Sequence, residues 1–143
     1  MISDKWKRRF IRRAMELASW SKDPSTQCGC VIYRNKRSLG EGYNGYPAGV
    51  ADNQDSREVK LMKTIHAEIN AILHAKQDVS GATLFVYPFE PCGNCASVII
   101  QAGITHVIAA VHYKIPPDRW LSTMNTARDM FKEAGVTLEV IQV

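Results

Sequence analysis

The chain has 143 residues, 45% of them hydrophobic, and its Lys and Arg residues outnumber Asp and Glu by 18 to 14. This length suits one domain that can bury a core without disulfide bonds, so we interpret residues 1–143 as a single domain. No apolar run approaches the length of a membrane span, and the N-terminal segment lacks the apolar stretch of a signal peptide. These features argue against a membrane partner and predict a cytoplasmic protein.

The excess positive charge lies in residues 1–13, which carry six basic residues and one acidic residue. One basic face of a helix is usually a solvated surface, and less often a patch for phosphates or for another subunit. We therefore expect no nucleic-acid partner.

The first half of the chain predicts a helix, a hairpin and a long loop. Residues 4–20 place apolar side chains at helical spacing, after Ser3 or Asp4 as the N-cap. Residues 28–33 and 38–43 are strand-like segments around a polar turn. The glycine-rich and polar stretch that follows, as far as residue 64, predicts a loop with one helical turn.

The second half predicts alternating helices and strands. Residues 65–77 predict a helix with Ile69, Ile72 and Leu73 on its buried face. Strands over 83–87 and 105–111, joined by a helix over 91–102, form a β-α-β unit. A helix from Asp118 ends at Gly135, before a last strand over 136–143, and its predicted inner side comprises Trp120, Leu121, Met124, Ala127, Phe131 and Ala134.

This order of elements predicts an α/β fold. The five strands are expected to form a single mixed five-stranded sheet, and the helices are expected to cover both of its faces.

Two short motifs carry the chemistry, His66-Ala67-Glu68 and Pro91-Cys92-Gly93-Asn94-Cys95. Zinc takes thiolate and imidazole ligands in tetrahedral geometry, and a catalytic zinc keeps its fourth position for water. Cys92 and Cys95 lie three residues apart at a predicted helix start, where the backbone N–H groups favour thiolates. His66 lies at another helix start. We therefore predict one zinc ion held by His66, Cys92 and Cys95.

Glu68 is predicted to carry protons and not to bind zinc. It is two residues from His66, and on a regular helix those two positions point in nearly opposite directions. A carboxylate beside the metal-activated water can take its proton and pass it on. The alternative is a closed structural zinc in a non-enzymatic scaffold, which needs a fourth ligand from His74, His106 or His112.

Cys28 and Cys30 are interpreted as small buried apolar residues. They lie one residue apart on a predicted strand, so their side chains share one face of the sheet.

With these motifs in their setting, nearly the whole chain resembles the deoxycytidylate (dCMP) deaminases of the cytidine deaminase superfamily. The stretches that carry the resemblance are Ser21 to Gln27, Gly42 to Pro47, His66 to Ile72, Pro91 to Ala96 and Ile99 to Ile104. The resemblance implies a three-layer α/β/α fold and hydrolytic conversion of dCMP to dUMP and ammonia. In that reaction water attacks C4 of the ring, and Glu68 moves a proton to N3 and then to the departing amine.

The resemblance also implies three substrate-binding residues. Asn44 would hold the deoxyribose, Thr26 would contact the substrate, and Tyr113 would lie near the base and the phosphate. His112 and Lys114 are further candidates for a phosphate contact.

The resemblance further implies a homohexamer that dCTP activates and dTTP inhibits, each with Mg²⁺. The second site would involve Gly42, Tyr43, Asn44 and Gly45. Some members hold a second, structural zinc, but this chain has no Cys or His between residues 31 and 65, so we do not expect one here.

Two other deaminase functions remain as alternatives. One is a deaminase of another small substrate, namely cytidine, deoxycytidine or guanine. The other is a transfer-RNA adenosine deaminase, in which the basic N-terminal helix would follow the phosphates and binding would weaken steeply with salt.

Overall fold

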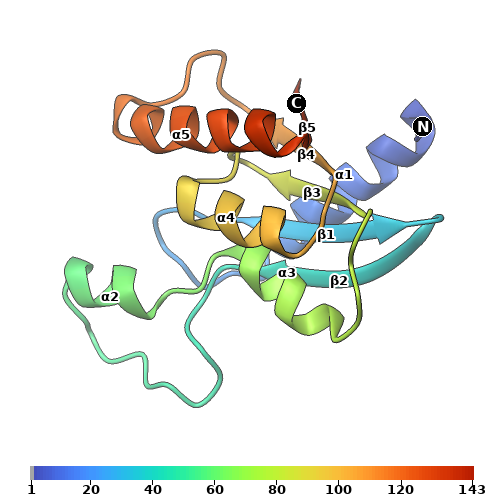
Figure 1. The fold of residues 1–143 in the computed structure, drawn as a ribbon. Helices are drawn as coiled ribbons and strands as arrows, with labels where there is room; N and C mark the ends of the chain where they lie inside the picture. The colour runs from blue at the N-terminus through green and yellow to red at the C-terminus, as the bar shows by residue number, and fades with distance from the viewer. Residues whose placement is uncertain (1) are drawn as a thin grey trace.

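The computed structural model describes residues 2–143 and has one sheet with the strand order β2-β1-β3-β4-β5 (Figure 1). The strands are β1 (Gly29–Arg34), β2 (Arg37–Tyr43), β3 (Thr83–Tyr87), β4 (His106–Val111) and β5 (Thr137–Gln142). β1 pairs antiparallel with β2 and β3, whereas β3, β4 and β5 run parallel. The predicted single mixed five-stranded sheet is therefore confirmed.

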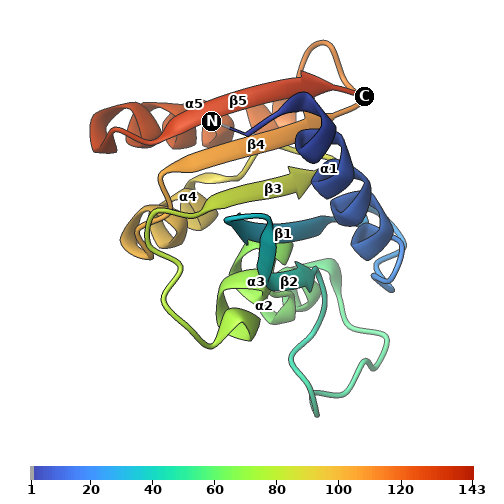
Figure 2. The ribbon, with the colours of Figure 1, turned by 90° about the vertical axis from the view of Figure 1, so that its right-hand side faces the viewer.

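Helices cover both faces of this sheet, as predicted. The helices are α1 (Asp4–Ala18), α2 (Arg57–Lys63), α3 (Ala67–Ala75), α4 (Gly93–Gln101) and α5 (Asp118–Ala134). Figure 2 shows α1 on one side of the sheet, and α3, α4 and α5 pack on the other side. Within residues 2–143, no helix is both long and apolar enough to span a bilayer.

Alternation along the strands builds the two cores that hold these layers together. Val31, Phe85 and Ile108 point toward α1, while their neighbours Cys30 and Leu84 point toward α3 and α4. All five side chains are buried. Because both faces of the central strands are covered, most residues of these strands are apolar.

α1 lies very close to β1 because both elements have small residues at the contact. A Cβ atom on Gly29 would lie 1.9 Å from the carbonyl oxygen of Ala14. The basic side chains of α1 point away from this contact, and two of them form ion pairs with the sheet, Lys7 with Glu139 and Arg13 with Glu41.

α2 is longer than the single turn expected from the sequence, and it has no buried residue. Ser56 caps it by accepting a hydrogen bond from the backbone of Val59. Figure 1 shows α2 standing apart from the other helices, beside the end of α3 that carries His66. Its stability therefore comes from its cap and from local contacts, not from a buried face.

α3 starts later than predicted because Ile65 belongs to an isolated β-bridge. Ile65 and Gly45 exchange two backbone hydrogen bonds of 2.8 and 3.1 Å, which leaves His66 as the helix cap. The helix therefore begins at Ala67, and His66 lies at its N-terminal end as the cap residue.

The predicted buried face of α3 was wrong at Leu73, which is 57% exposed. The face that meets β2 consists of alanines, and Ala71 is fully buried. Two glycines of β2 make room for them, because a Cβ on Gly40 would lie 2.3 Å from the carbonyl oxygen of Ala71. The prediction from the sequence placed the larger residues of α3 on its buried face because they are the most hydrophobic. Where two backbones come this close, however, only small residues fit between them.

The inner side of α5 is narrower than predicted. Met124, Ala127 and Phe131 are buried, whereas Leu121 is 40% exposed and Ala134 is also exposed. The helix ends where predicted, at Gly135, whose φ of 76° suits a left-handed cap.

Candidate active site

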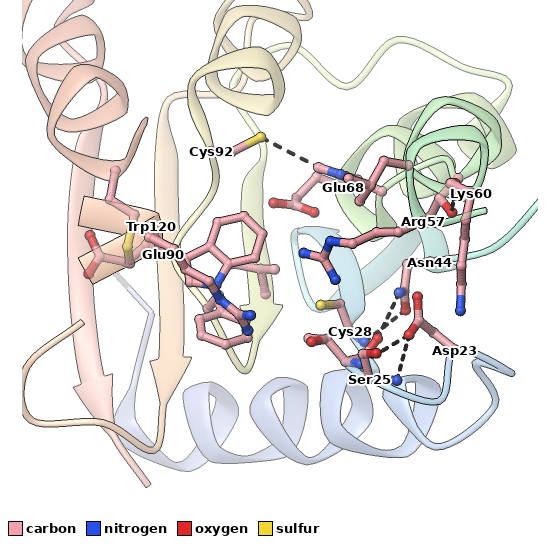
Figure 3. A pocket seen from close by; sticks show the side chains of 18 residues that line it. Asp23, Ser25, Cys28, Asn44, Arg57, Lys60, Glu68, Glu90, Cys92 and Trp120 are labelled. Atoms are coloured by element: carbon pink, nitrogen blue, oxygen red, sulfur yellow. Dashed lines mark hydrogen bonds between the residues drawn. The ribbon is translucent and has the colours of Figure 1, made fainter. Parts of the chain in front are cut away.

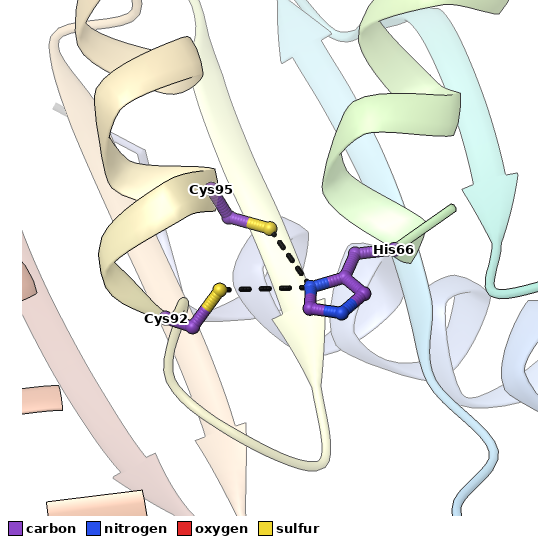
Figure 4. Close-up of side chains that lie close together, drawn as sticks. All are labelled: His66, Cys92 and Cys95. Carbon is purple, nitrogen blue, oxygen red and sulfur yellow. Dashed lines mark hydrogen bonds between the residues drawn. The ribbon is translucent and has the colours of Figure 1, made fainter. Parts of the chain in front are cut away.

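His66, Cys92 and Cys95 meet at the N-terminal ends of α3 and α4 (Figure 4). His66 and Cys92 are the caps of the two helices, and Cys95 lies in the first turn of α4. The Nδ1 atom of His66 is 3.2 Å from the Sγ atom of Cys95 and 3.6 Å from that of Cys92. The structure thus brings together the three residues predicted as zinc ligands.

These distances fit a zinc ion. Tetrahedral bonds to nitrogen and sulfur place neighbouring donor atoms roughly 3.5 Å apart. The two cysteines are already coupled, because the Cys92 sulfur accepts hydrogen bonds from Cys95 and His66, which lowers the pKa of Cys92 to about 4. The hydrogen bond to Cys92, together with burial, raises the pKa of the Cys95 thiol. A dication at this point would favour the thiolate form of both residues.

Among residues 2–143, these three form the one group of His, Cys, Asp and Glu side chains arranged to hold a metal ion. The other histidines have different neighbours. His74 lies beside the carbonyl of Glu41, His106 beside the carboxylate of Glu139, and His112 beside the hydroxyl of Tyr87. None of these three histidines is placed to be a fourth ligand, so a metal ion held by His66, Cys92 and Cys95 would keep one position for a water molecule.

Glu68 lies in the first turn of α3 and is only 6% exposed. Burial raises the pKa of its carboxyl group, although nearby His66 opposes this effect. Glu68 also lines the cavity next to His66 and Cys92. A carboxyl group with a raised pKa beside a metal-bound water can act as both proton acceptor and proton donor.

His66, Glu68 and Cys92 form the floor of a cavity of about 200 Å³ (Figure 3), whereas Cys95 is fully buried and does not line it. One wall is apolar and aromatic, with Phe89, Trp120 and Met124. The opposite wall comes from the segment after α1 and from α2. The cavity therefore offers a flat ring an apolar slot that leads to His66 and Cys92.

Asn44 and Thr26 line the cavity, but the Asn44 side chain also has a structural role. Its Oδ1 accepts a hydrogen bond from the backbone N–H of Cys28 at 2.8 Å, and its Nδ2 donates one to the carbonyl of Thr26 at 2.9 Å. Asp23 shapes the same segment by accepting hydrogen bonds from the backbones of Ser25 and Thr26. Asn44 thus fixes the segment that covers the cavity, and one amide hydrogen remains for a ligand.

Tyr113 is not among the residues that line this cavity in the described chain. Its ring stacks on Phe89, and its hydroxyl donates a hydrogen bond of 3.2 Å to Glu90. Burial, with a further contribution from the Glu90 carboxylate, raises the pKa of Tyr113 to about 12, so the hydroxyl remains a donor. The aromatic side chains that face the cavity are Phe89 and Trp120.

Three cationic side chains of the cavity were missed from the sequence. Arg57 and Lys60 come from α2, and Arg119 comes from the start of α5. None of them forms an ion pair with another residue of the described chain. Arg57 and Lys60 lie in a segment that the sequence predicted mainly as loop, and Arg119 lies beside an apolar helix face. The sequence therefore provided little indication that these side chains line a cavity.

Cys28 and Cys30 share one sheet face, as predicted, but their environments differ. Cys30 is fully buried in the core, whereas Cys28 is half-buried and lines the cavity. Burial raises the pKa of both thiols, so they remain protonated at neutral pH.

A second cavity of about 340 Å³ adjoins the first. Tyr43, Asn44 and Gly45 line it, whereas Gly42 is buried against α3. The two cavities share four residues as a common wall: Asp23, Asn44, Lys60 and Thr64.

Comparison with known protein families gives a match that agrees with this site. Residues 4–111 match the model of the cytidine and deoxycytidylate deaminase zinc-binding region. That stretch contains both motifs, His66 to Glu68 and Pro91 to Cys95.

Individual relatives agree with the family match. An uncharacterised deaminase from the luxG 3′ region of Aliivibrio fischeri is 49% identical over 95% of this chain and 92% of its own length. Deoxycytidylate deaminase of Mus musculus is 38% identical over 92% of this chain and 77% of its own. The dCMP deaminase of cyanophage S-TIM5 in complex with dCMP and dUMP has a TM-score of 0.82, covers 99% of this chain and 100% of its own, and is 23% identical. The chain therefore belongs to the cytidine and deoxycytidylate deaminase family.

Proposed function

We propose that the protein catalyses the hydrolytic deamination of dCMP to dUMP and ammonia. The observation that carries this proposal is one cavity with His66, Cys92 and the buried carboxyl group of Glu68 at its floor, where the third donor Cys95 adjoins them. Three cations along its walls form no ion pair within residues 2–143. Relatives named deoxycytidylate deaminase support the choice of substrate. So does the similar fold of a protein solved with dCMP and dUMP.

The proposed chemistry takes place at the floor of the cavity. His66, Cys92 and Cys95 would hold the zinc ion, which when bound supplies a water molecule with a pKa lowered to about 7. Glu68 would accept a proton from the attacking water and deliver it to N3 of the cytosine ring as the water oxygen bonds to C4. Glu68 then carries a proton to the departing amino nitrogen, so that water and dCMP yield dUMP and ammonia.

The side walls of the cavity would position the nucleotide. Phe89 and Trp120 offer aromatic faces against which a pyrimidine can pack. Arg57, Lys60 and Arg119 have no acidic partner among the described residues, so they are suited to the 5′-phosphate. The deoxyribose then lies between base and phosphate, where Asn44 and Thr26 can contact it. A direct contact of Tyr113 with substrate stays a prediction.

A substrate panel tests this proposal. The purified protein is incubated with dCMP, CMP, deoxycytidine and guanine, and the deaminated products are quantified. The expected result is the highest kcat/KM for dCMP. Faster turnover of a nucleoside or of guanine would overturn the choice of substrate, and retention of a transfer RNA at moderate salt would favour the editing alternative.

The second cavity favours nucleotide regulation as an additional function. Because it shares Asp23, Asn44 and Lys60 with the first cavity, a ligand in one can shift side chains that face the other. We propose that dCTP activates and dTTP inhibits the enzyme from this cavity, with Mg²⁺ accompanying the nucleotide phosphates. The dCMP assay repeated with each nucleotide and Mg²⁺ tests this. An unchanged rate with both would contradict it.

Assembly into a homohexamer is part of the same proposal. Analytical ultracentrifugation with and without dCTP gives the mass of the particle directly. A monomer under both conditions would contradict it.

A further inference from the structure

The segment between β3 and α4 carries a buried carboxylate two residues before the metal donor Cys92. The side chain of Glu90 is only 2% exposed. Its two oxygens accept hydrogen bonds from Nε and Nη2 of Arg128 on α5, at 2.7 and 2.6 Å. The hydroxyl of Tyr113 donates a third bond, at 3.2 Å.

This pairing is needed because an isolated carboxylate is strongly disfavoured in a protein interior. Arg128 supplies a forked, charge-assisted contact that fixes both the position and the orientation of the carboxylate. The Arg128 side chain is 46% exposed, so only the Glu90 side of the pair is buried. The position of Glu90 therefore depends on α5.

Two more contacts tie the same segment to α5. The backbone N–H of Gly93, directly after Cys92, donates a hydrogen bond of 2.8 Å to the hydroxyl of Thr123. The ring of Phe89 lies against Trp120, with centroids 5.6 Å apart. The segment that presents Cys92 is thus held from both sides of this cysteine by one helix.

We propose that Arg128 is a positioning residue that acts through Glu90 to hold Cys92 in the geometry that retains zinc. This inference rests on the proposed zinc centre but not on the identity of the substrate. Arg128 does not line the cavity, so it acts without touching the substrate. The same pair also places Phe89 on the cavity wall, because Phe89 is the neighbour of Glu90.

The chain contains a matched control. Arg13 and Glu41 form another forked pair, with bonds of 2.7 and 2.8 Å, between α1 and β2. The Arg13 side chain is 41% exposed, close to the value for Arg128. Neither Arg13 nor Glu41 lines the cavity, and neither is near a metal donor in sequence.

The test measures zinc release from the zinc-loaded protein to a chromophoric chelator, together with the thermal unfolding midpoint. Arg128→Ala is expected to release zinc about tenfold faster than the wild type, as is usual when groups that support metal ligands are lost. Arg128→Lys keeps the charge but not the fork, so it is expected to keep the fold and to give an intermediate rate. Arg13→Ala is expected to leave the rate unchanged.

A double variant separates positioning from the penalty of an unpaired buried charge. Glu90→Gln combined with Arg128→Ala removes that charge, so the unfolding midpoint should recover relative to Arg128→Ala alone. Fast zinc release should persist, since the forked contact that orients residue 90 is still missing and only the Phe89–Trp120 and Gly93–Thr123 contacts tie the segment to α5. If release returns to the wild-type rate in the double variant, or if Arg13→Ala accelerates it equally, the proposal is wrong.

Assaying the wild type with dCMP distinguishes a failure of the proposed function from a failure of the proposed role of Arg128. A wild-type protein that retains zinc but does not deaminate dCMP would overturn the proposed function and leave the zinc-release comparison intact. A wild-type protein that deaminates dCMP while Arg128→Ala and Arg128→Lys release zinc at its own rate would overturn only the role of Arg128.

Discussion

Gly42 of β2 lies so close to α3 that a Cβ atom on it would be 2.4 Å from the backbone nitrogen of Ala71. This contact sets the distance between β2 and the helix whose first turn carries Glu68. Gly42 is therefore required for packing, whatever the neighbouring Tyr43 and Asn44 do for a ligand.

Gly42→Ala should destabilise the protein by about 1–3 kcal/mol, the usual effect of forcing one extra carbon into a packed interior. Gly45→Ala is the control within the same glycine-rich stretch, because a Cβ there meets no atom within 4 Å. Chemical denaturation should show a change of less than about 0.5 kcal/mol for that variant. Equal effects of the two substitutions would refute the close-packing argument.

Glu68→Gln should leave a folded protein that still binds zinc but deaminates dCMP at least about 100-fold more slowly, because the amide cannot accept and return a proton. Zinc content and thermal unfolding are measured on the same sample as the activity. Residual activity near the wild-type level would show that another group moves the proton.

Arg57→Ala should lower kcat/KM for dCMP by about tenfold or more, since a charge-assisted hydrogen bond contributes roughly 1.5–3 kcal/mol. The loss should be absent with deoxycytidine, which has no phosphate. Lys63→Ala is the matched control, because Lys63 lies on the same helix and pairs with Asp55 outside the cavity. An equal loss with both substrates would mean that Arg57 does not contact the phosphate.

Asn44→Ala should lower the free energy of unfolding by about 1–3 kcal/mol, because it removes the hydrogen-bond partners of the Cys28 N–H and the Thr26 carbonyl. It should also raise KM for dCMP, since the covering segment loses its anchor. Asn70→Ala, which removes a single exposed bond to the carbonyl of Tyr43, serves as the comparison. Equal changes in the free energy of unfolding and in KM for the two variants would contradict this role of Asn44.

His106 should make the protein less stable as the pH falls below about 6.5. Burial lowers the pKa of its ring, while Glu139 opposes the shift and Lys7 adds to it. Within residues 2–143, the Nε2 atom of His106 has no hydrogen-bond partner. The unfolded chain then binds a proton at a pH where the folded chain does not, so stability rises with pH through this window.

The measurement compares unfolding midpoints of the wild type and His106→Gln between pH 7 and pH 5. The wild type should lose more stability on acidification than the variant. Parallel curves would show that His106 does not titrate differently in the two states.

The metal donors could be predicted from the sequence because their geometry is local. Cys92 and Cys95 share one helical turn, and His66 and Glu68 lie two residues apart. The central strands were predictable for a similar reason, since β3 and β4 are short, mainly apolar segments. The one long-range prediction was that the N-terminal ends of two helices converge. It followed from interpreting the two motifs as parts of one site.

The cavity walls could not be predicted in the same way. Apolar spacing placed Trp120 on the inner side of α5, but whether an inner residue faces a core or a cavity depends on what packs opposite. Arg57 and Lys60 lie on a helix without a buried face, so hydrophobic periodicity gave no signal for it. Ala71 faces β2 in place of Leu73 because of glycines about thirty residues earlier in the chain.

The arrangement of the two helix starts also has a consequence for the orientation of the substrate. Two cysteine thiolates would balance the two positive charges of a zinc ion, so the floor of the cavity would carry little net charge apart from Glu68. Arg57, Lys60 and Arg119 carry three positive charges on the walls, against one negative charge on Asp23, while Glu90 is paired with Arg128. A molecule with a neutral ring at one end and a phosphate at the other would therefore meet an electrostatic gradient that favours entry ring first. With dCMP, this would bring the reactive carbon to the zinc site before the phosphate leaves the solvent.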